Sequence, residues 1–232
     1  MNITPYKTEY GLYPAMPGFK VAIGDYGVWK GHEWCPLGNI YETYGPISFN
    51  VKEEEVSRDE TCDVGVSMSA GVGADINAPA VDARTVLDFG AVGGLHYRAH
   101  IVKVTRFASV QNEVYTFMKK YLDLGIWEPK LWLAVEVCEA DDLLSIQSKA
   151  KGVKVEINGG SSDELKLAKM NFESHFKYDR ASVSSLHFSD VRQFAGARFV
   201  SFTRTGIFRN RLIPGYQGAT IDFETASEQV VY

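Results

Sequence analysis

The sequence predicts a single α+β domain built on a twisted, mainly antiparallel sheet with long amphipathic hairpins and a few packed helices. Two stretches, residues 64–76 and 87–101, alternate between apolar and polar side chains, which is the period of a half-buried strand. A third stretch, after Ser109, repeats at helical spacing. No repeat or linker divides the 232 residues. We therefore expect one domain over residues 1–232, with residues 213–232 as a polar C-terminal tail.

The N-terminal part of the chain predicts only short elements. Residues 1–20 are polar and proline-containing, and we expect a loop-rich segment there. A strand is expected to start over residues 20–23, followed by a turn at Gly24 and Asp25. Further short strand and turn pieces are expected over residues 28–29 and 33–40. The acidic run at residues 53–55 is typical of a solvated face.

The two alternating stretches predict a first long hairpin with a loop of about ten residues between its strands. Ordinary strands have about 5–6 residues, whereas residues 64–76 alternate over thirteen. A large curved sheet in a soluble protein would produce the same alternation. That explanation leaves open why one apolar face is rich in small residues and the polar face is rich in glycine.

The middle of the chain predicts a helix and then further strands. Ser109 is expected to cap a helix that ends before Gly125. A compact central strand is expected over residues 131–137, and residues 140–151 are expected to form a helical or irregular link. A strand over residues 153–157 follows. A second long hairpin is then expected from the face shared by Met170, Phe172, Phe176 and Tyr178 and from a strand over residues 183–202.

Composition and charge narrow the class of protein. The formal net charge is −5 and the isoelectric point about 5.6, which disfavours nucleic acid as a partner. Three widely spaced cysteines without a CxxC pair indicate reduced thiols and a cytoplasmic protein. The sequence contains no signal peptide and no apolar run long enough for a transmembrane helix.

Motifs of enzymes and of metal sites are lacking. None of GxSxG, HExxH, the P-loop or GxGxxG occurs, so we expect no catalytic residue and no cofactor. Arg98 between His96 and His100 disfavours metal binding and favours a polar sheet face. Glu136 and Glu139, at the end of a strand, leave a carboxylate-dependent hydrolase open as an alternative. Solvated charges at a strand end are the more common explanation.

Basic residues are concentrated in stretches that lack acidic ones. No Asp or Glu lies between Asp88 and Glu113 or from Arg192 to Arg211. Such tracts attract anionic lipid headgroups. The predicted lipid-binding residues are Lys103, Arg106, Lys119, Lys120, Arg192, Arg198, Arg204, Arg209 and Arg211. One alternative is a nucleic-acid backbone with Phe194, Phe199 and Phe202 stacked on bases. Another is that the basic residues pair with acids elsewhere in the fold.

Long amphipathic strand pairs in a soluble domain are typical of pore-forming proteins. A strand that crosses a bilayer in a barrel needs about 9–11 alternating residues, and both alternating stretches exceed that length. Hairpins around residues 62–104 and 164–203 would extend, insert and assemble into a ring. The predicted membrane-inserting residues are Val64, Val66, Met68, Val72, Leu87, Phe89, Leu95, Tyr97, Met170, Phe172, Phe176 and Phe199.

The order of these elements resembles the pore-forming domain of the gasdermin family. The stretch 20–23 followed by Trp29, Trp34 and residues 37–40 resembles the opening of that domain. Residues 131–137 resemble the apolar strand that follows its central helix, and residues 197–200 resemble its late strand with the order of residues altered. The two hairpins fall in the corresponding intervals. The resemblance spans most of the chain through short motifs.

The resemblance implies a function and also shows departures from the animal members. We expect no separate repressor domain and find no basic N-terminal helix, so the chain is most similar to the single-domain fungal gasdermin-like proteins of allorecognition cell death. That similarity implies anionic membrane lipids and copies of the same chain as partners. It also implies activation by a sequence-divergent homologue, and movement from cytoplasm to plasma membrane. The alternative is a non-enzymatic β-rich module that binds a protein or glycan.

Overall fold

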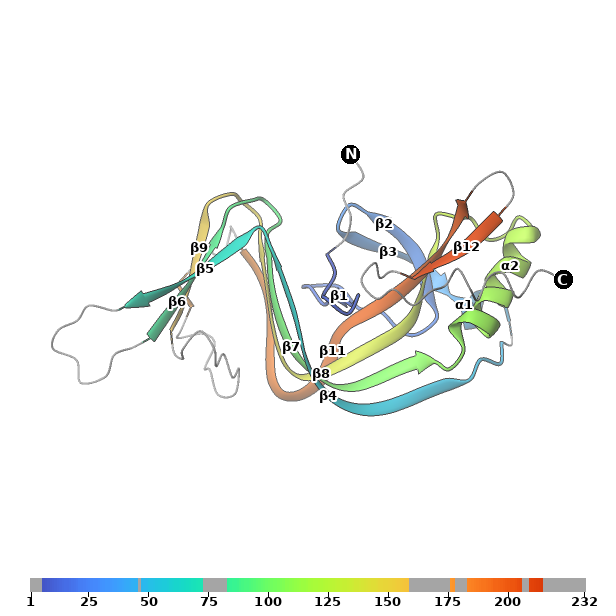
Figure 1. Cartoon of the computed structure of the whole chain (residues 1–232), viewed down its shortest axis with the longest axis horizontal. Helices are drawn as coiled ribbons and strands as arrows, with labels where there is room; N and C mark the ends of the chain where they lie inside the picture. The colour runs from blue at the N-terminus through green and yellow to red at the C-terminus, as the bar shows by residue number, and fades with distance from the viewer. Residues whose placement is uncertain are drawn as a thin grey trace.

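Four long antiparallel strands form the backbone of the fold (Figure 1). The computed structural model describes residues 6–45, 47–72, 83–158, 176–177, 183–205 and 209–214. The long strands are β4 (Val51–Val64), β7 (Leu95–Phe107), β8 (Trp132–Ser148) and β11 (Val183–Thr205). They pair antiparallel in the order β4–β7–β8–β11. A mainly antiparallel sheet with few helices is therefore confirmed.

Short strands extend this sheet at the end near the helices. β1 (Tyr13–Pro14) and β12 (Arg209–Pro214) pair with β11. β2 (Asp25–Lys30) pairs with the beginning of β8 and with β3 (Glu33–Asn39). Helix α1 (Ile40–Thr43) follows β3 directly. Helix α2 (Tyr115–Asp123) follows a π-helical turn, Val110–Val114.

A second sheet continues the four long strands at their far end. It consists of β5 (Val66–Val72), β6 (Ala83–Phe89), β9 (Val153–Asn158) and β10 (Phe176–Lys177), in the order β10–β9–β6–β5. Gly65, Gly93 and Gly152 have positive φ angles at the corners between the sheets, a conformation that glycine adopts without strain. We call residues 51–107 hairpin 1 and residues 132–205 hairpin 2.

The four long strands bend together midway along their length (Figure 1). The pairing register shifts between Glu55 and Arg58 on β4, between His100 and Lys103 on β7, and between Ser189 and Gln193 on β11. An extra residue in one strand bends that strand and increases its twist. Since these irregularities lie beside one another across the sheet, they combine into one sharp bend.

Separate apolar clusters support the two sides of the bend. One cluster packs α2 on the sheet through Phe117, Met118 and Trp127. Another fills the angle between the two sheets, with Leu87, Phe89, Leu144, Ile146, Val155, Ile157 and Val183. A third lies on the inner side of the bend itself and contains residues of all four long strands. The bent shape therefore buries apolar side chains of both hairpins.

Several sequence predictions are confirmed, and several are wrong. Strand β9 and the helix after Ser109 are confirmed, with Gly125 just beyond the helix at φ 71°. The first hairpin is confirmed only as the pairing of β5 with β6, because corners at Gly65 and at residues 90–94 interrupt the strands expected over 64–76 and 87–101. The strand expected over residues 183–202 is present as β11, but it pairs with β8, whereas Phe176 pairs with β9. Residues 140–151 are not a helical link, because β8 continues to Ser148. Residues 20–23 form no strand, and the Ser109 side chain makes no capping hydrogen bond. The acidic run at 53–55 lies on β4 with its side chains exposed, so the expected solvated face is confirmed.

Candidate functional site

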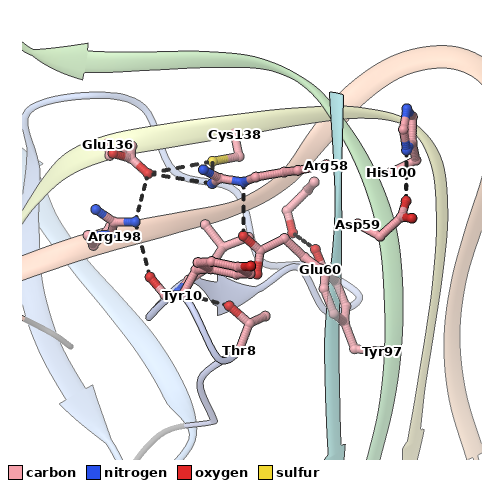
Figure 2. A network of polar contacts seen from close by, with 12 residues as sticks. Thr8, Tyr10, Arg58, Asp59, Glu60, Tyr97, His100, Glu136, Cys138 and Arg198 are labelled. Atoms are coloured by element: carbon pink, nitrogen blue, oxygen red, sulfur yellow. Dashed lines mark hydrogen bonds and ion pairs between the residues drawn. The ribbon is translucent and has the colours of Figure 1, made fainter. Parts of the chain in front are cut away.

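A charged network lies on the inner side of the bend and joins both hairpins (Figure 2). Arg58 on β4 places Nε 3.0 Å from Glu60 Oε1 and Nη2 3.9 Å from Glu136 Oε1 on β8. Arg198 on β11 places Nη2 3.3 Å from the same Glu136 oxygen. Arg58 and Glu60 are two residues apart, so they share one face of their strand. Glu136 therefore couples hairpin 1 to the last strand of hairpin 2.

The two glutamates of this network lie in different electrostatic surroundings. The Glu60 side chain is fully buried, and burial raises the pKa of its carboxyl above the ordinary value even though the Thr8 hydroxyl and the Arg58 charge act to lower it. The Glu136 side chain is 7% exposed and forms ion pairs with Arg58 and Arg198, whose side chains are each about 30% exposed. Burial thus disfavours the charged form of Glu60, whereas the carboxylate of Glu136 is paired with two arginine charges.

Two buried thiols accompany the network. Burial raises the pKa of the Cys138 thiol to about 12 and that of the Cys62 thiol to about 11. Cys138 Sγ lies 3.8 Å from Arg58 Nη2, and Cys62 Sγ donates to the backbone oxygen of Lys7 at 3.3 Å. Neither thiol is activated as a nucleophile, so the site supports a structural role for both.

On the opposite face of β4, aspartates pair with basic residues of β7. Asp63 accepts from His96 Nδ1 and from Arg98 Nη2, both at 2.7 Å, and His100 Nδ1 lies 2.8 Å from Asp59. Burial acts to raise the pKa of Asp63, but the contacts with His96 and Arg98 lower it overall. The predicted polar sheet face is therefore a row of cross-strand pairs. Among the described residues, no group of three His, Cys, Asp or Glu side chains is arranged to hold a metal ion.

Asp142 on β8 extends this row towards β11. It lies opposite His100 in the register of β7 and β8. Burial, together with the charges of Asp141 and Asp190, raises the pKa of Asp142 to about 6. Asp190 has a φ angle of 60° in the irregular segment of β11. The bend thus brings acidic side chains of neighbouring strands close to one another.

The predicted membrane-inserting residues divide into buried and exposed groups. Leu87, Phe89, Leu95, Tyr97 and Phe199 are completely buried, whereas Val64 and Met68 are 39% and 50% exposed. Val66 is half-buried beside the cluster between the two sheets. The backbones of Val72 and Phe176 pair with Ala83 and Ile157, and Met170 and Phe172 lie outside the described residues. Most of the apolar face of hairpin 1 is therefore covered.

Four of the predicted lipid-binding residues are ion-paired with glutamates. Lys103 pairs with Glu53, Arg106 with Glu54, Arg192 with Glu55 and Arg198 with Glu136, at 2.8–3.3 Å. The alternative that these basic residues meet acids elsewhere in the fold is thus what the structure shows for them. Lipid binding by these residues stays a prediction, and it would require the pairs to rearrange.

The other predicted basic residues lie at the end of the molecule near α2. Lys119 and Lys120 are exposed on α2, and the Lys120 ammonium lies 5.5 Å over the Tyr121 ring. Within the part of the chain that the structure describes, neither lysine makes an ion pair. The backbones of Arg204, Arg209 and Arg211 lie in neighbouring rungs of the β11–β12 pair. Lipid binding by these five residues stays a prediction.

The residues that sequence reasoning missed lie on β4. An alternation follows the acidic run at 53–55, and within it one face of the strand carries Val56, Arg58, Glu60 and Cys62. Period-two alternation of half-buried side chains was the available signal. No local pattern predicts that these residues lie beside Glu136 and Arg198, because that contact depends on the order of strands in the sheet.

Comparison with known proteins yields no further guide to this site. No family model, curated protein or solved structure matches the chain. In the described residues, no helix is both long and apolar enough to cross a membrane.

Proposed function

We propose that this chain is a gasdermin-like pore-forming protein, which binds anionic lipid, inserts both long hairpins and assembles into a ring that lyses the cell. The observation that supports it most is the order β4–β7–β8–β11, in which hairpins 1 and 2 lie side by side as one antiparallel sheet. The strands contain 14, 13, 17 and 23 residues, and a spanning strand needs about 9–11.

Insertion needs a change of shape but little new pairing. The backbone hydrogen bonds of β4 with β7, β7 with β8 and β8 with β11 are already made, which membranes require of any spanning strand. Opening the bend and the glycine corners would join each long strand to its continuation in the second sheet. The face that carries Leu87, Phe89 and Leu95, now buried, would then meet lipid.

Assembly would use the two edges of the four-stranded sheet. Within the described residues, β4 pairs only with β7, and residues 183–194 of β11 pair only with β8. The acids Glu53, Glu55 and Asp59 of the β4 edge pair within the chain with Lys103, Arg192 and His100. An edge of unpaired backbone groups is a template for another chain, so β4 in one copy would pair with residues 183–194 of β11 in the next.

The biological context of the proposal rests on the resemblance to fungal gasdermin-like proteins. It supports lytic cell death in allorecognition, triggered when the chain meets a sequence-divergent homologue. The protein would be cytoplasmic while inactive and would move to the plasma membrane when activated. Exposed Lys119 and Lys120 would make the first contact with anionic headgroups, at about 1 kcal/mol for each basic residue near the surface.

Release of a dye from anionic liposomes tests this function, with Met68→Arg and Ser69→Arg as a matched pair. Both side chains are exposed on β5, so neither change disturbs the soluble fold. They point to opposite faces of the strand, and Met68 lies opposite Leu87 on the lipid-facing side. An arginine in the middle of the lipid face costs about 2–4 kcal/mol.

We expect leakage to fall for Met68→Arg and to persist for Ser69→Arg, with rings of wild-type protein in electron micrographs of the liposomes. Absence of leakage and rings at micromolar protein, alone and with a sequence-divergent homologue, would refute pore formation. Equal effects of the two arginines would refute the assignment of the lipid-facing side.

A further inference from the structure

The N-terminal segment, residues 6–16, crosses the inner side of the bend and contacts both hairpins. We call it the strap. Its first residues bind hairpin 1, where the Tyr6 hydroxyl donates to the backbone oxygen of Gly93 and the Lys7 oxygen accepts from Cys62 Sγ. The Tyr6 ring also stacks on His32 of the β2–β3 turn, with centroids 4.0 Å apart and planes within 5°. The strap is therefore held between the core and the corner of hairpin 1.

The following residues of the strap bind hairpin 2. Arg198 Nη2 donates to the backbone oxygen of Tyr10 at 3.0 Å, and β1 pairs with Gly196 and Ala197 of β11. The Ala15 amide donates to the Ala195 oxygen at 2.8 Å. The same oxygen accepts from the hydroxyl of buried Tyr97 on β7, also at 2.8 Å. One backbone group of β11 thus joins the strap to both hairpins.

The strap also completes the apolar cluster on the inner side of the bend. Tyr6, Leu12 and Ala15 pack in one cluster with side chains of every long strand, which are Cys62, Leu95, Tyr97, Ala99, Ile101, Val104, Cys138, Ala140, Leu143, Phe188 and Ala195. Leu12 and Ala15 are completely buried. Straightening the sheet would spread these strand residues apart and leave the strap without its site. The bent sheet and the bound strap therefore require each other.

We propose that the strap is a lock that holds the two hairpins in their bent arrangement, and that its release is the step that permits them to straighten. The proposal rests on the proposed function only for the consequence of straightening, because the lock itself is a property of the soluble chain. Removal of the strap uncovers the inner cluster and the charged network together, so both hairpins are freed in one event.

Two features make the strap releasable as a unit. Its only strand, β1, has two residues, so few ladder hydrogen bonds hold it. A hollow of about 340 Å³ lies where Tyr6, Lys7 and His32 meet Val64, Gly65 and the corner at residues 91–94. Open space thus borders the contact of the strap with hairpin 1, and release of the strap would begin there.

Gly196 provides a substitution that acts on the strap from the opposite side. A Cβ at this position would lie 2.6 Å from the Tyr13 oxygen and 2.8 Å from Leu12 Cγ, so Gly196→Ala pushes the strap away from β11. Gly90→Ala is the matched control, since a Cβ there meets nothing closer than 4.0 Å. Tyr6→Phe is a milder second variant that removes only the hydroxyl bound to Gly93.

The native cysteines report on the lock directly. Cys62 and Cys138 both belong to the apolar cluster that the strap completes. Maleimide labelling of these thiols while the far-UV circular dichroism spectrum stays native measures strap release, and labelling that accompanies loss of that spectrum measures global unfolding. Hydrogen exchange of β7 and β8 amides near the bend measures loosening of the hairpins, and dye release from anionic liposomes measures insertion.

We expect Gly196→Ala to raise the labelling rate of Cys62 by about tenfold or more, with faster exchange at the bend and faster dye release, and Gly90→Ala to match wild type. Tyr6→Phe should shift the same readouts by less, and it decides the matter if Gly196→Ala loses the native circular dichroism spectrum. Faster labelling of Cys62 without faster hydrogen exchange at the bend, or unchanged labelling in both variants, would overturn the lock.

Dye leakage that fails to accelerate after strap release, while wild-type protein causes leakage, would overturn the gating role of the strap. If no variant leaks, including wild type, pore formation fails while labelling and exchange still decide the lock.

Discussion

Replacement of Glu136 by glutamine is expected to destabilise the fold, because it removes the carboxylate paired with Arg198 and leaves Arg58 paired with Glu60 alone. The carboxylate lies 3.3 Å from Arg198 and 3.9 Å from Arg58, and the glutamate side chain is 7% exposed. Removing one member of a buried ion pair costs about 3–5 kcal/mol. The arginine side chains keep 31% and 30% of their exposure, so water replaces part of the lost interaction. We therefore expect a loss of about 2 kcal/mol in the free energy of unfolding at neutral pH.

Glu60→Gln in the same network is expected to cost less, about 1 kcal/mol or below. Burial raises the pKa of Glu60, so its ionised form is less stable in the fold than in water. A raised pKa contributes most stability below the unfolded value, and that contribution is lost as pH rises through the folded value. Relative to the glutamine variant, wild type should therefore lose stability as pH rises above the ordinary glutamate range.

Urea unfolding followed by circular dichroism at several pH values measures both effects. Glu128→Gln is the matched control, because its pair with Lys130 is exposed at the surface and surface pairs contribute about 0–1 kcal/mol. The reasoning is refuted if Glu60→Gln destabilises as much as Glu136→Gln at neutral pH. It is equally refuted if Glu136→Gln behaves like the surface control, since the arginines would then not depend on Glu136.

Three further predictions concern the bend. Burial raises the pKa of Asp142 to about 6, so Asp142→Asn should stabilise the protein by about 1 kcal/mol at pH 7.5 and have no effect near pH 4, as measured by thermal unfolding at both pH values. Iodoacetamide at pH 7.5 should modify Cys35 in the folded protein and reach Cys62 and Cys138 only after denaturation, because burial raises the pKa of both buried thiols; mass spectrometry that finds all three modified in the native state contradicts the burial. Tyr97→Phe should cost about 1 kcal/mol by loss of its donation to the Ala195 oxygen, and equal urea midpoints would show that the hydroxyl contributes nothing.

Local patterns account for the parts of the fold that could be predicted. Strands β5, β6 and β9 alternate with a clear period, and α2 carries a helical apolar stripe with glycine beyond its end. These signals need only neighbouring residues. The same reasoning missed most of β4 and the second half of β8. β4 presents charges on much of its surface, and residues 140–148 of β8 are buried on both faces in places, so neither alternates simply.

The sequence predicted which types of residue the site contains, but not which partners they contact. The acid-free basic tracts are real features of the sequence, yet Arg106 meets Glu54 at a separation of 52 residues and Arg192 meets Glu55 at a separation of 137. Such pairs follow from the register of strands and from the bend, which places β11 within reach of β4. Charge counted along the chain therefore overestimates the positive surface that the folded protein presents.

The sequence by itself determined the period of β5, β6 and β9, the position of α2 and the residue types of an amphipathic hairpin. These depend on the alternation of side chains along one strand, which is local chemistry. Only the tertiary structure decided that the two hairpins form one bent sheet, that a strap closes the bend, and that glutamates neutralise the basic tracts. Those outcomes depend on contacts between residues far apart in the chain, and they are set by burial of the shared core rather than by any local pattern.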